Sequence, residues 1–237
     1  MDIFCEFTGL RSDGRYPGEM RFISGSIGVI SGCTGSSHFK MGQTEVFAQI
    51  FGPYESRNAS NLLGIKVQVE YADFAKAPHL QDTTSSKRGR ELEVIIKRTF
   101  ESAIKRDTYR NSEILISITV IQDDGSIESA AINGASLAII DAGIPTADFL
   151  VSITATFYND RYFLDSGRME SQTKYPTLLL ALYPSTSSIV TMNMSARISP
   201  EDTQKLIEIA TEGCLHLHQD LSGIVRRASQ DHVTKQE

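Results

Sequence analysis

The sequence predicts an α+β fold, in which runs of β-strands are interrupted by single helices. Residues Gly64–Ala72 alternate apolar with polar side chains, the period-two pattern of a strand with one buried face. Residues Arg88–Arg106 repeat their apolar side chains at intervals of three and four, the pattern of an amphipathic helix. The segments follow in the order four strands, helix, strand, helix, four strands, helix, with no linker between separate units, which is typical of an α+β protein.

The first half of the chain is expected to form four strands and one helix. An irregular lead-in extends to about residue 20, because Arg11–Arg21 is rich in glycine, proline and charged residues. The pair Gly42-Gln43 fits a tight turn between the second and third strands. The polar segment Ala75–Ser86 is expected to be a loop before the helix Arg88–Arg106. The expected strands are Phe22–Ile30, Ser36–Met41, Thr44–Phe51 and Gly64–Ala72.

The second half begins with a β-branched strand, Glu113–Ile121. Ser129–Ala142 is small and apolar almost all round, which predicts a buried helix that Gly143 and Pro145 bring to an end. Four strands follow, with a hairpin turn predicted at Asn159-Asp160. These strands are Phe149–Tyr158, Tyr162–Asp165, Thr177–Tyr183 and Ser188–Met194.

The last helix opens with a recognisable start signal. Ser199 is the predicted N-cap, Pro200 takes the first helical position, and Asp202 completes a capping box only loosely. Apolar residues at helical spacing carry the helix to about Arg227. The polar tail from about residue 228 is expected to fray.

Composition limits the classes of protein. The 237 residues, 41% of them hydrophobic, suit one large domain or two small ones with a shared core, since single domains reach about 250 residues. A net charge of −6 and a pI of about 5.4 argue against a protein that binds RNA without partner proteins. A local basic patch on one face is still compatible with these values.

Cysteine placement and hydropathy exclude further classes. Cys5, Cys33 and Cys214 are far apart and show no Cys/His spacing, so neither a zinc site nor a disulfide framework is expected. All three are expected to be small buried side chains in a reducing compartment. No basic segment followed by an apolar run opens the chain, and no stretch approaches about 18 apolar residues, so we expect neither a signal peptide nor a membrane partner.

Six segments in one order resemble a known family, the RNase PH-like proteins. Arg11-Ser-Asp-Gly-Arg15 with Glu19-Met-Arg21 resembles the family opening, Arg-x-Asp-Gly-Arg…Glu-x-Arg. Each segment alone also has a plain structural explanation, such as a turn, a hairpin or a helix exit, and only their joint order favours the family. The other five segments are Gly35–Ala48, Phe51–Pro53, Phe100–Ile104, Leu137–Pro145 and Ser195–Arg197.

The resemblance is greatest to ring subunits of the RNA exosome, of the type whose archaeal counterpart is catalytic. It implies a single RNase PH-like domain over residues 1–237, with mixed sheets packed against three main helices. It also implies other RNase PH-like ring subunits, cap subunits, an associated exoribonuclease and RNA as partners. The implied location is the nucleus, including the nucleolus, and the cytoplasm; no cofactor and no metal are expected.

Active members of the family cleave RNA from its 3′ end with inorganic phosphate as the attacking group. A phosphate needs cationic side chains and a helix N-terminus, and the family places them at the start of its second helix. Here Ile127 stands where a hydroxyl would donate, and Glu128 where active members carry an arginine. Ser126 can still donate, as a vestige of a phosphate site, although an N-cap role explains it as well.

The acidic part of the resemblance is also incomplete. Active members carry Leu-Asp-x-x-x-x-Glu-Asp, to assist proton transfer or bind a metal. Asp165 matches the first acid and is a vestigial catalytic residue on this basis, whereas Ser171 replaces the second. Where a further acid is expected downstream, the chain reads Gln172-Thr-Lys-Tyr-Pro176. A lone aspartate at a strand end is otherwise a common turn residue.

Basic residues at family positions are candidates for RNA binding. Lys87 and Arg88 replace a pair of arginines before the first helix, with Arg90 close by, and lysine lacks the bidentate fork of arginine. Arg57 lies in a loop that faces RNA in relatives. All of them are also compatible with an ordinary solvated surface.

Two functions from different classes stay open. The favoured one is a non-catalytic ring subunit that shapes the RNA path and recruits partner nucleases. The alternative is an active phosphate-dependent 3′-to-5′ exoribonuclease, and Glu128 and Ser171 are the residues that count against it. An unrelated α+β scaffold with fortuitous matches is the remote third explanation.

Overall fold

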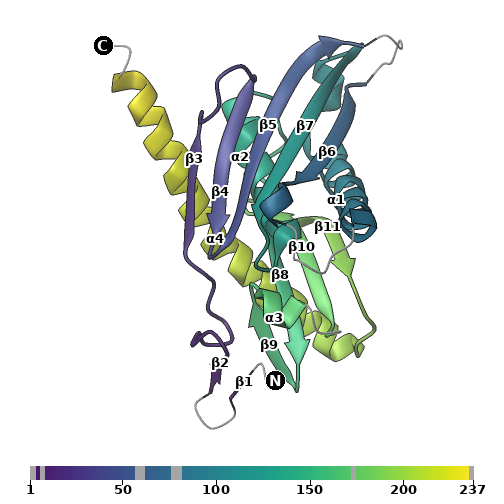
Figure 1. The fold of residues 1–237 in the computed structure, drawn as a ribbon, viewed down its shortest axis with the longest axis vertical. Helices are drawn as coiled ribbons and strands as arrows, with labels where there is room; N and C mark the ends of the chain where they lie inside the picture. Colours follow the sequence, from purple (N-terminus) through teal and green to yellow (C-terminus); the bar gives the residue numbers. More distant parts are fainter. Residues whose placement is uncertain (1–3, 6–8, 57–61, 76–81, 172–174, 235–237) are drawn as a thin grey trace.

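Two β-sheets and three long helices form the molecule, which the computed structural model describes over residues 4–5, 9–56, 62–75, 82–171 and 175–234 (Figure 1). The larger sheet has five strands in the order β3-β4-β5-β7-β6. Its pairs are antiparallel except β6 with β7, which makes it a mixed sheet. The strands are β3 (Ile23–Ile27), β4 (Gly35–Met41), β5 (Thr44–Glu55), β6 (Gly64–Tyr71) and β7 (Ser112–Gln122).

The second sheet is antiparallel, with four strands in the order β11-β10-β8-β9. Its strands are β8 (Val151–Tyr158), β9 (Arg161–Leu164), β10 (Thr177–Tyr183) and β11 (Ser188–Met194). The helices are α1 (Asp82–Ala103), α2 (Ile127–Asp141), the one-turn α3 (Arg168–Ser171) and α4 (Pro200–Thr234). A short pair, β1 (Phe4–Cys5) with β2 (Leu10–Arg11), and two 3₁₀ turns, Asp73–Ala75 and Arg106–Thr108, complete the described elements.

Helix α2 lies between the two sheets. Every residue from 129 to 139 is buried, as its all-round apolar sequence predicts. On one side the Ser37 hydroxyl of β4 donates to the Gly134 carbonyl over 2.6 Å. On the other, the Asn133 amide donates to the Ser152 carbonyl of β8 over 2.8 Å and accepts from the Ser152 N–H over 2.8 Å. The helix therefore fixes how the sheets face each other.

The other long helices cover the flanks. Helix α1 packs beside β6, where its Glu93 carboxylate accepts the Val69 N–H over 3.0 Å, and its Thr99 hydroxyl contacts that of Thr191 in β11 over 2.8 Å. Helix α4 packs on β8 and β9, so closely that a methyl group on Gly213 would come within 2.9 Å of Ile153. One apolar core runs through all these layers, from Phe39 to Ile224.

The element order and the turns agree with the sequence-based expectation. The strands β10 and β11 have the predicted bounds. Asn159 and Asp160 both have positive φ, 44° and 56°, which a two-residue type I′ hairpin turn requires. Gly143, with φ 66°, follows α2, and Ile144 N–H closes back to Ile139 over 3.2 Å, which is the expected helix stop. Asp202 N–H bonds to the Ser199 hydroxyl over 3.1 Å, which confirms the predicted N-cap.

Several boundaries differ from the prediction. Helix α1 begins at Asp82, so residues 82–86, the last part of the expected loop Ala75–Ser86, are helical, because packed later turns let a helix continue through polar residues that carry no apolar pattern. For the same reason α4 continues past Arg227 to Thr234. Strand β3 ends at Ile27, since Gly28 takes φ 67° and turns the chain away.

The cysteine prediction is only partly right. Cys214 is a free, fully buried thiol in α4, and burial raises its pKa to about 12. Cys33 is free and half-buried, in the loop between β3 and β4 rather than in a strand, and its thiol contacts the Ile30 carbonyl over 3.2 Å. None of the described helices combines the length and apolar character needed to cross a membrane.

Candidate functional site

The loop before α2 has an unusual backbone. Gly125 and Ser126 both have positive φ, 94° and 51°. The Arg21 guanidinium donates to the carbonyls of Asp124 and Gly125 over 2.9 and 3.2 Å, and the Thr44 hydroxyl donates to the Gly125 carbonyl over 2.7 Å. These bonds hold the chain in the left-handed region, which non-glycine residues such as Ser126 rarely adopt.

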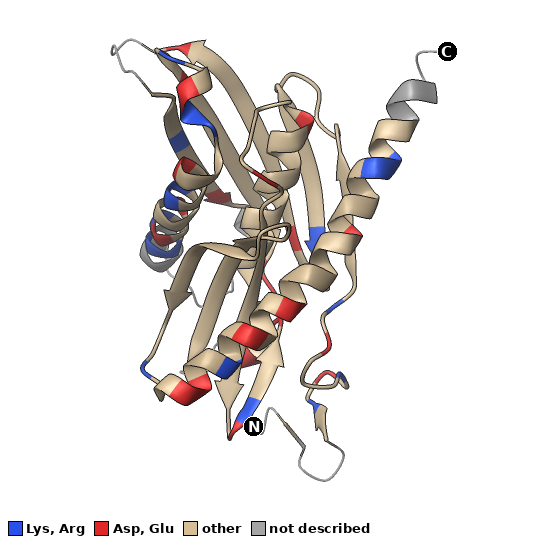
Figure 2. Ribbon diagram, turned by 180° about the vertical axis from the view of Figure 1, so that it is seen from behind, with Lys and Arg blue, Asp and Glu red and all other residues tan. Residues whose placement is uncertain are grey.

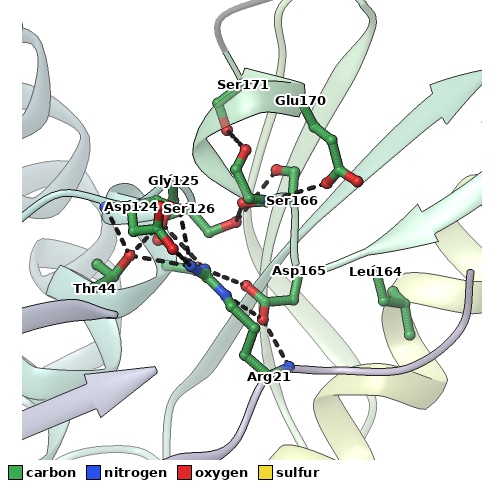
Figure 3. Close-up of polar contacts among 12 residues, drawn as sticks. Arg21, Thr44, Asp124, Gly125, Ser126, Leu164, Asp165, Ser166, Glu170 and Ser171 are labelled. Atoms are coloured by element: carbon green, nitrogen blue, oxygen red, sulfur yellow. Dashed lines mark hydrogen bonds and ion pairs between the residues drawn. The ribbon is translucent and has the colours of Figure 1, made fainter. Parts of the chain in front are cut away.

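Ser126 occupies the N-cap position of α2, but its side chain makes no cap, so the predicted capping role is wrong. The left-handed backbone directs the hydroxyl away from the helix, and it donates to the Ser166 carbonyl over 2.8 Å. Figure 3 shows this contact beside Arg21. The hydroxyl is buried against the loop between β9 and α3. Because its proton is already donated to the Ser166 carbonyl, Ser126 is not free to bind an anion.

Glu128, in the first turn of α2, is a half-buried carboxyl. Burial raises its pKa, and the charge of Glu91 in α1 raises it further. A carboxylate at a helix start is ordinarily favoured by the helix dipole. Burial and the nearby charge of Glu91 both disfavour a negative charge at this position, which makes it unfavourable for phosphate.

The first turns of α1 lie within electrostatic reach of this helix start. Burial raises the pKa of the Tyr71 hydroxyl; the charges of Asp123 and Glu128 add to the rise, while Arg88 opposes it. Arg88, Asp123 and Glu128 therefore all lie within electrostatic range of Tyr71. The structure thus brings Arg88, a candidate RNA-binding residue, toward the start of α2. Lys87 and Arg88 are both exposed. Arg57 lies outside the described residues.

Asp165, at the end of β9, is completely buried and has φ 51°. The Arg21 guanidinium grips both of its oxygens, with Nε–Oδ2 at 2.7 Å and Nη2–Oδ1 at 2.6 Å (Figure 3). The Arg21 N–H adds a third bond to Oδ2 at 2.9 Å, and Arg15 Nη1 lies 3.4 Å from the same oxygen. With its lone pairs used in this way, the carboxylate anchors the lead-in segment.

Glu170 is the second acid used as an anchor. It is buried, and Arg11 grips both carboxylate oxygens, with Nε–Oε1 at 2.9 Å. The Gly167 N–H also donates to Glu170 Oε2 over 2.9 Å, which fixes the turn into α3. The neighbouring Ser171, by contrast, is exposed, and its hydroxyl donates to the Gly167 carbonyl over 3.0 Å.

The chain matches the 3′ exoribonuclease family, domain 1, over residues 19–145. The exosome complex component RRP41 of Homo sapiens is 30% identical over 224 residues, which cover 92% of this chain and 91% of that protein. The RRP41 homolog of Arabidopsis thaliana is 34% identical over 213 residues, 87% of each chain. The chain belongs to the RNase PH family.

Solved structures agree on the RNase PH fold. The crystal structure of rice Rrp46 gives a TM-score of 0.78 at 23% identity, over 90% of this chain and 98% of that one. A subunit of the Archaeoglobus fulgidus exosome, with RNA bound to its active site, gives 0.77 at 20% identity, over 90% and 93% of the two chains. The expected α+β architecture is confirmed.

The lead-in arginines belong to the family-like opening, and what the sequence did not predict is which residues they contact. A turn with a surface ion pair is the plain explanation of Asp13, Gly14 and Arg15, and the Arg15–Asp13 contact at 2.7 Å is present. The more important contacts join Arg11 and Arg21 to Glu170 and Asp165, about 150 residues away. The motif marks the arginines, but nothing in the sequence indicates that Glu170 and Asp165 are their partners.

No group of three or more His, Cys, Asp or Glu side chains suited to a metal occurs in the part of the chain that the structure describes. Asp165 and Glu170, the two acids near the family position, both face arginines. The residues Gln172, Thr173 and Lys174 of the downstream family segment lie outside the described residues.

Proposed function

We propose that this chain is a non-catalytic ring subunit of an RNA exosome. The observation that carries the proposal is the start of α2, where a half-buried carboxyl, Glu128, stands in place of the family arginine and within reach of the charge of Glu91, so that burial and like charge oppose phosphate. The use of Asp165 as a buried anchor for Arg21 supports it, since the acid that matches the first position of the family motif already bonds the Arg21 guanidinium and backbone N–H.

The alternative, a phosphate-dependent exoribonuclease, is tested on the purified chain. We expect no phosphate-dependent release of nucleoside diphosphates from single-stranded RNA. Asp165→Asn would be a poor control, because it would break the buried contacts with Arg21 and destabilise the fold. Arg88→Ala is the better control, since Arg88 is exposed. Diphosphate release that depends on phosphate and is abolished by Arg88→Ala would establish the alternative.

The ring assignment rests on the family and on the names of the relatives, which are exosome components. We propose a hexameric ring of different RNase PH-like subunits, with cap subunits and an associated exoribonuclease, in the nucleus, nucleolus and cytoplasm. Strand β11 is the last strand of its sheet, so one of its backbone edges has no strand partner among the described residues, and such an edge favours pairing with another chain.

Co-purification tests the assembly. A tagged chain is isolated from native cells, and its partners are identified by mass spectrometry. Other RNase PH-like chains at equal stoichiometry are the expected result. A chain that stays monomeric in analytical ultracentrifugation and brings down no such partner would contradict the assignment.

Within this function, Lys87 and Arg88 are proposed RNA contacts. They are exposed, they match family positions, and Arg88 lies within electrostatic reach of the α2 start. Several subunits around one channel can each contribute a small basic patch, and such phosphate contacts add up even when the chain has a net charge of −6.

A further inference from the structure

The outward face of α1 is strongly basic over three turns. Five cations between positions 87 and 98 are exposed, against the single exposed acid Glu91, so the exposed charge of this stretch is +5 − 1 = +4 in a chain of net charge −6. Glu93 is turned toward β6, where it accepts the Val69 N–H over 3.0 Å. The cations are Lys87, Arg88, Arg90, Lys97 and Arg98.

Three of these cations share one face of the helix, and Arg88 and Lys97 flank that face on either side. The helical repeat of 3.6 residues places Lys87, Arg90 and Arg98 on the same face as Glu91 and the exposed Val94. Figure 2 shows the basic bands along α1, while the first turns of α4 carry mainly acidic ones. We call the surface of Lys87, Arg88, Arg90, Lys97 and Arg98 the α1 ridge.

Four members of the α1 ridge have no carboxylate within ion-pair distance among the described residues. They are Lys87, Arg88, Lys97 and Arg98. Elsewhere on the surface, lysines do have such partners: Lys66 lies 2.9 Å from Glu113, and Lys40 lies 3.6 Å from Glu45. A row of unpaired like charges is unfavourable by itself and is relieved by a polyanion.

The dimensions suit a single-stranded nucleic acid. With a rise of about 1.5 Å per residue, the ridge extends about 16 Å from Lys87 to Arg98. It begins at the family RNA positions Lys87 and Arg88 and continues along α1 for three turns. Flexible cations spaced along a groove or ridge follow a phosphate backbone without reading its sequence.

We propose that the α1 ridge is an RNA track, on which Lys97 and Arg98 contact backbone phosphates of single-stranded RNA that has passed Lys87 and Arg88. This inference rests on the proposed exosome function and extends it to a surface to which the family resemblance assigns no role. The contacts are electrostatic, so they are independent of base sequence and weaken with salt.

The test compares two double variants in the assembled complex, purified through the tagged chain. Lys97→Glu/Arg98→Glu reverses the far end of the α1 ridge. Arg226→Glu/Arg227→Glu is the matched control, because it reverses two adjacent exposed arginines on α4. The probe is a labelled single-stranded oligoadenylate, and its dissociation constant is measured by anisotropy across a salt series.

We expect Lys97→Glu/Arg98→Glu to weaken binding about tenfold or more at low salt. The slope of log affinity against log salt should fall by about 1.4, which is two contacts at about 0.7 each for a single strand. The control should leave both quantities unchanged. The variant Lys97→Gln/Arg98→Gln removes the contacts without adding repulsion and should give the same change in slope. It tests the proposal even if the glutamate variant folds poorly.

Three results would overturn the RNA track. The track is rejected if both ridge variants keep the affinity and the slope unchanged in a complex that still contains its RNase PH-like partners. That result would not contradict the proposed exosome function. Loss of those partners with the ridge variants alone would identify the ridge as a protein interface, to which exposed Val94, Ile189 and Met192 would then belong. Equal weakening by the α4 control would show a non-specific charge effect. If the unaltered chain brings down no RNase PH-like partner, the proposed function itself fails.

Discussion

Replacing Arg21 by alanine should destabilise the protein severely. The Arg21 side chain is 8% exposed and Asp165 is 0% exposed, so the variant leaves a buried carboxylate with Arg15, at 3.4 Å, as its remaining charged partner. Burial opposes the charge of Arg21, but its hydrogen bond with Asp165 and the charge of that acid raise the Arg21 pKa, so the arginine is charged at every accessible pH.

The size of the effect follows from what is lost. Removing one partner of a buried ion pair costs about 3–5 kcal/mol. The hydrogen bonds to the Asp124 and Gly125 carbonyls are lost as well, at about 1 kcal/mol each. Against a total of about 5–15 kcal/mol for a native domain, this loss is a large share of the stability.

Urea unfolding followed by circular dichroism measures the loss. Arg21→Ala should lower the midpoint strongly with little change in slope, whereas Arg226→Ala, at an exposed position, should stay within about 0.5 kcal/mol of the native protein. The double variant Arg21→Ala/Asp165→Asn should recover part of the loss, since the unpaired charge is gone. An Arg21→Ala midpoint equal to that of Arg226→Ala would refute this account of the pair.

The remaining predictions concern the start of α2. The pKa of Glu128 is raised above its ordinary value of 4.5, so its contribution to stability is fully present below that pH and is lost as the pH rises through the folded pKa. Glu128→Gln should therefore raise the urea midpoint at pH 7 and leave it unchanged near pH 4; an equal effect at both pH values would contradict this. At Gly125, φ is 94° and a Cβ would lie 2.5 Å from the backbone of the β9–α3 loop. Gly125→Ala should therefore lower the free energy of unfolding by about 3 kcal/mol, measured by thermal unfolding. Gly143→Ala is the control, since Gly143 has φ 66° but open space around it and should cost only about 1 kcal/mol.

The sequence is sufficient to predict the elements whose pattern is local. The period-two run of β6, the all-round apolar α2 and the turn residues Asn159-Asp160 are each recognisable from the sequence alone. The start of α1 is not predictable in this way, because Asp82–Ser86 carries no apolar repeat and becomes helical only as an extension of packed turns.

The site was less predictable than the fold, because its contacts join distant parts of the chain. Taken one at a time, Asp165 and Ser126 each have an ordinary local explanation in the sequence, as a turn residue and as an N-cap, and neither explanation names the partner that the side chain contacts. Their actual partners, Arg21 and the Ser166 carbonyl, are 144 and 40 residues away in the sequence. No periodicity or spacing rule connects such pairs, and only the assembled sheets bring them together.

The arginine anchors have a consequence for the order of folding. Arg11, Arg15 and Arg21 leave the ribosome about 150 residues before their partners Asp165 and Glu170. At about 5–20 residues per second, the lead-in waits on the order of ten seconds for its acidic partners. The first β-sheet can form during this interval, but the guanidinium groups stay hydrated until β9 exists. Completion of the second sheet therefore closes the lead-in segment onto the molecule, so residues 11–21 reach their final place only after segments that are synthesised much later.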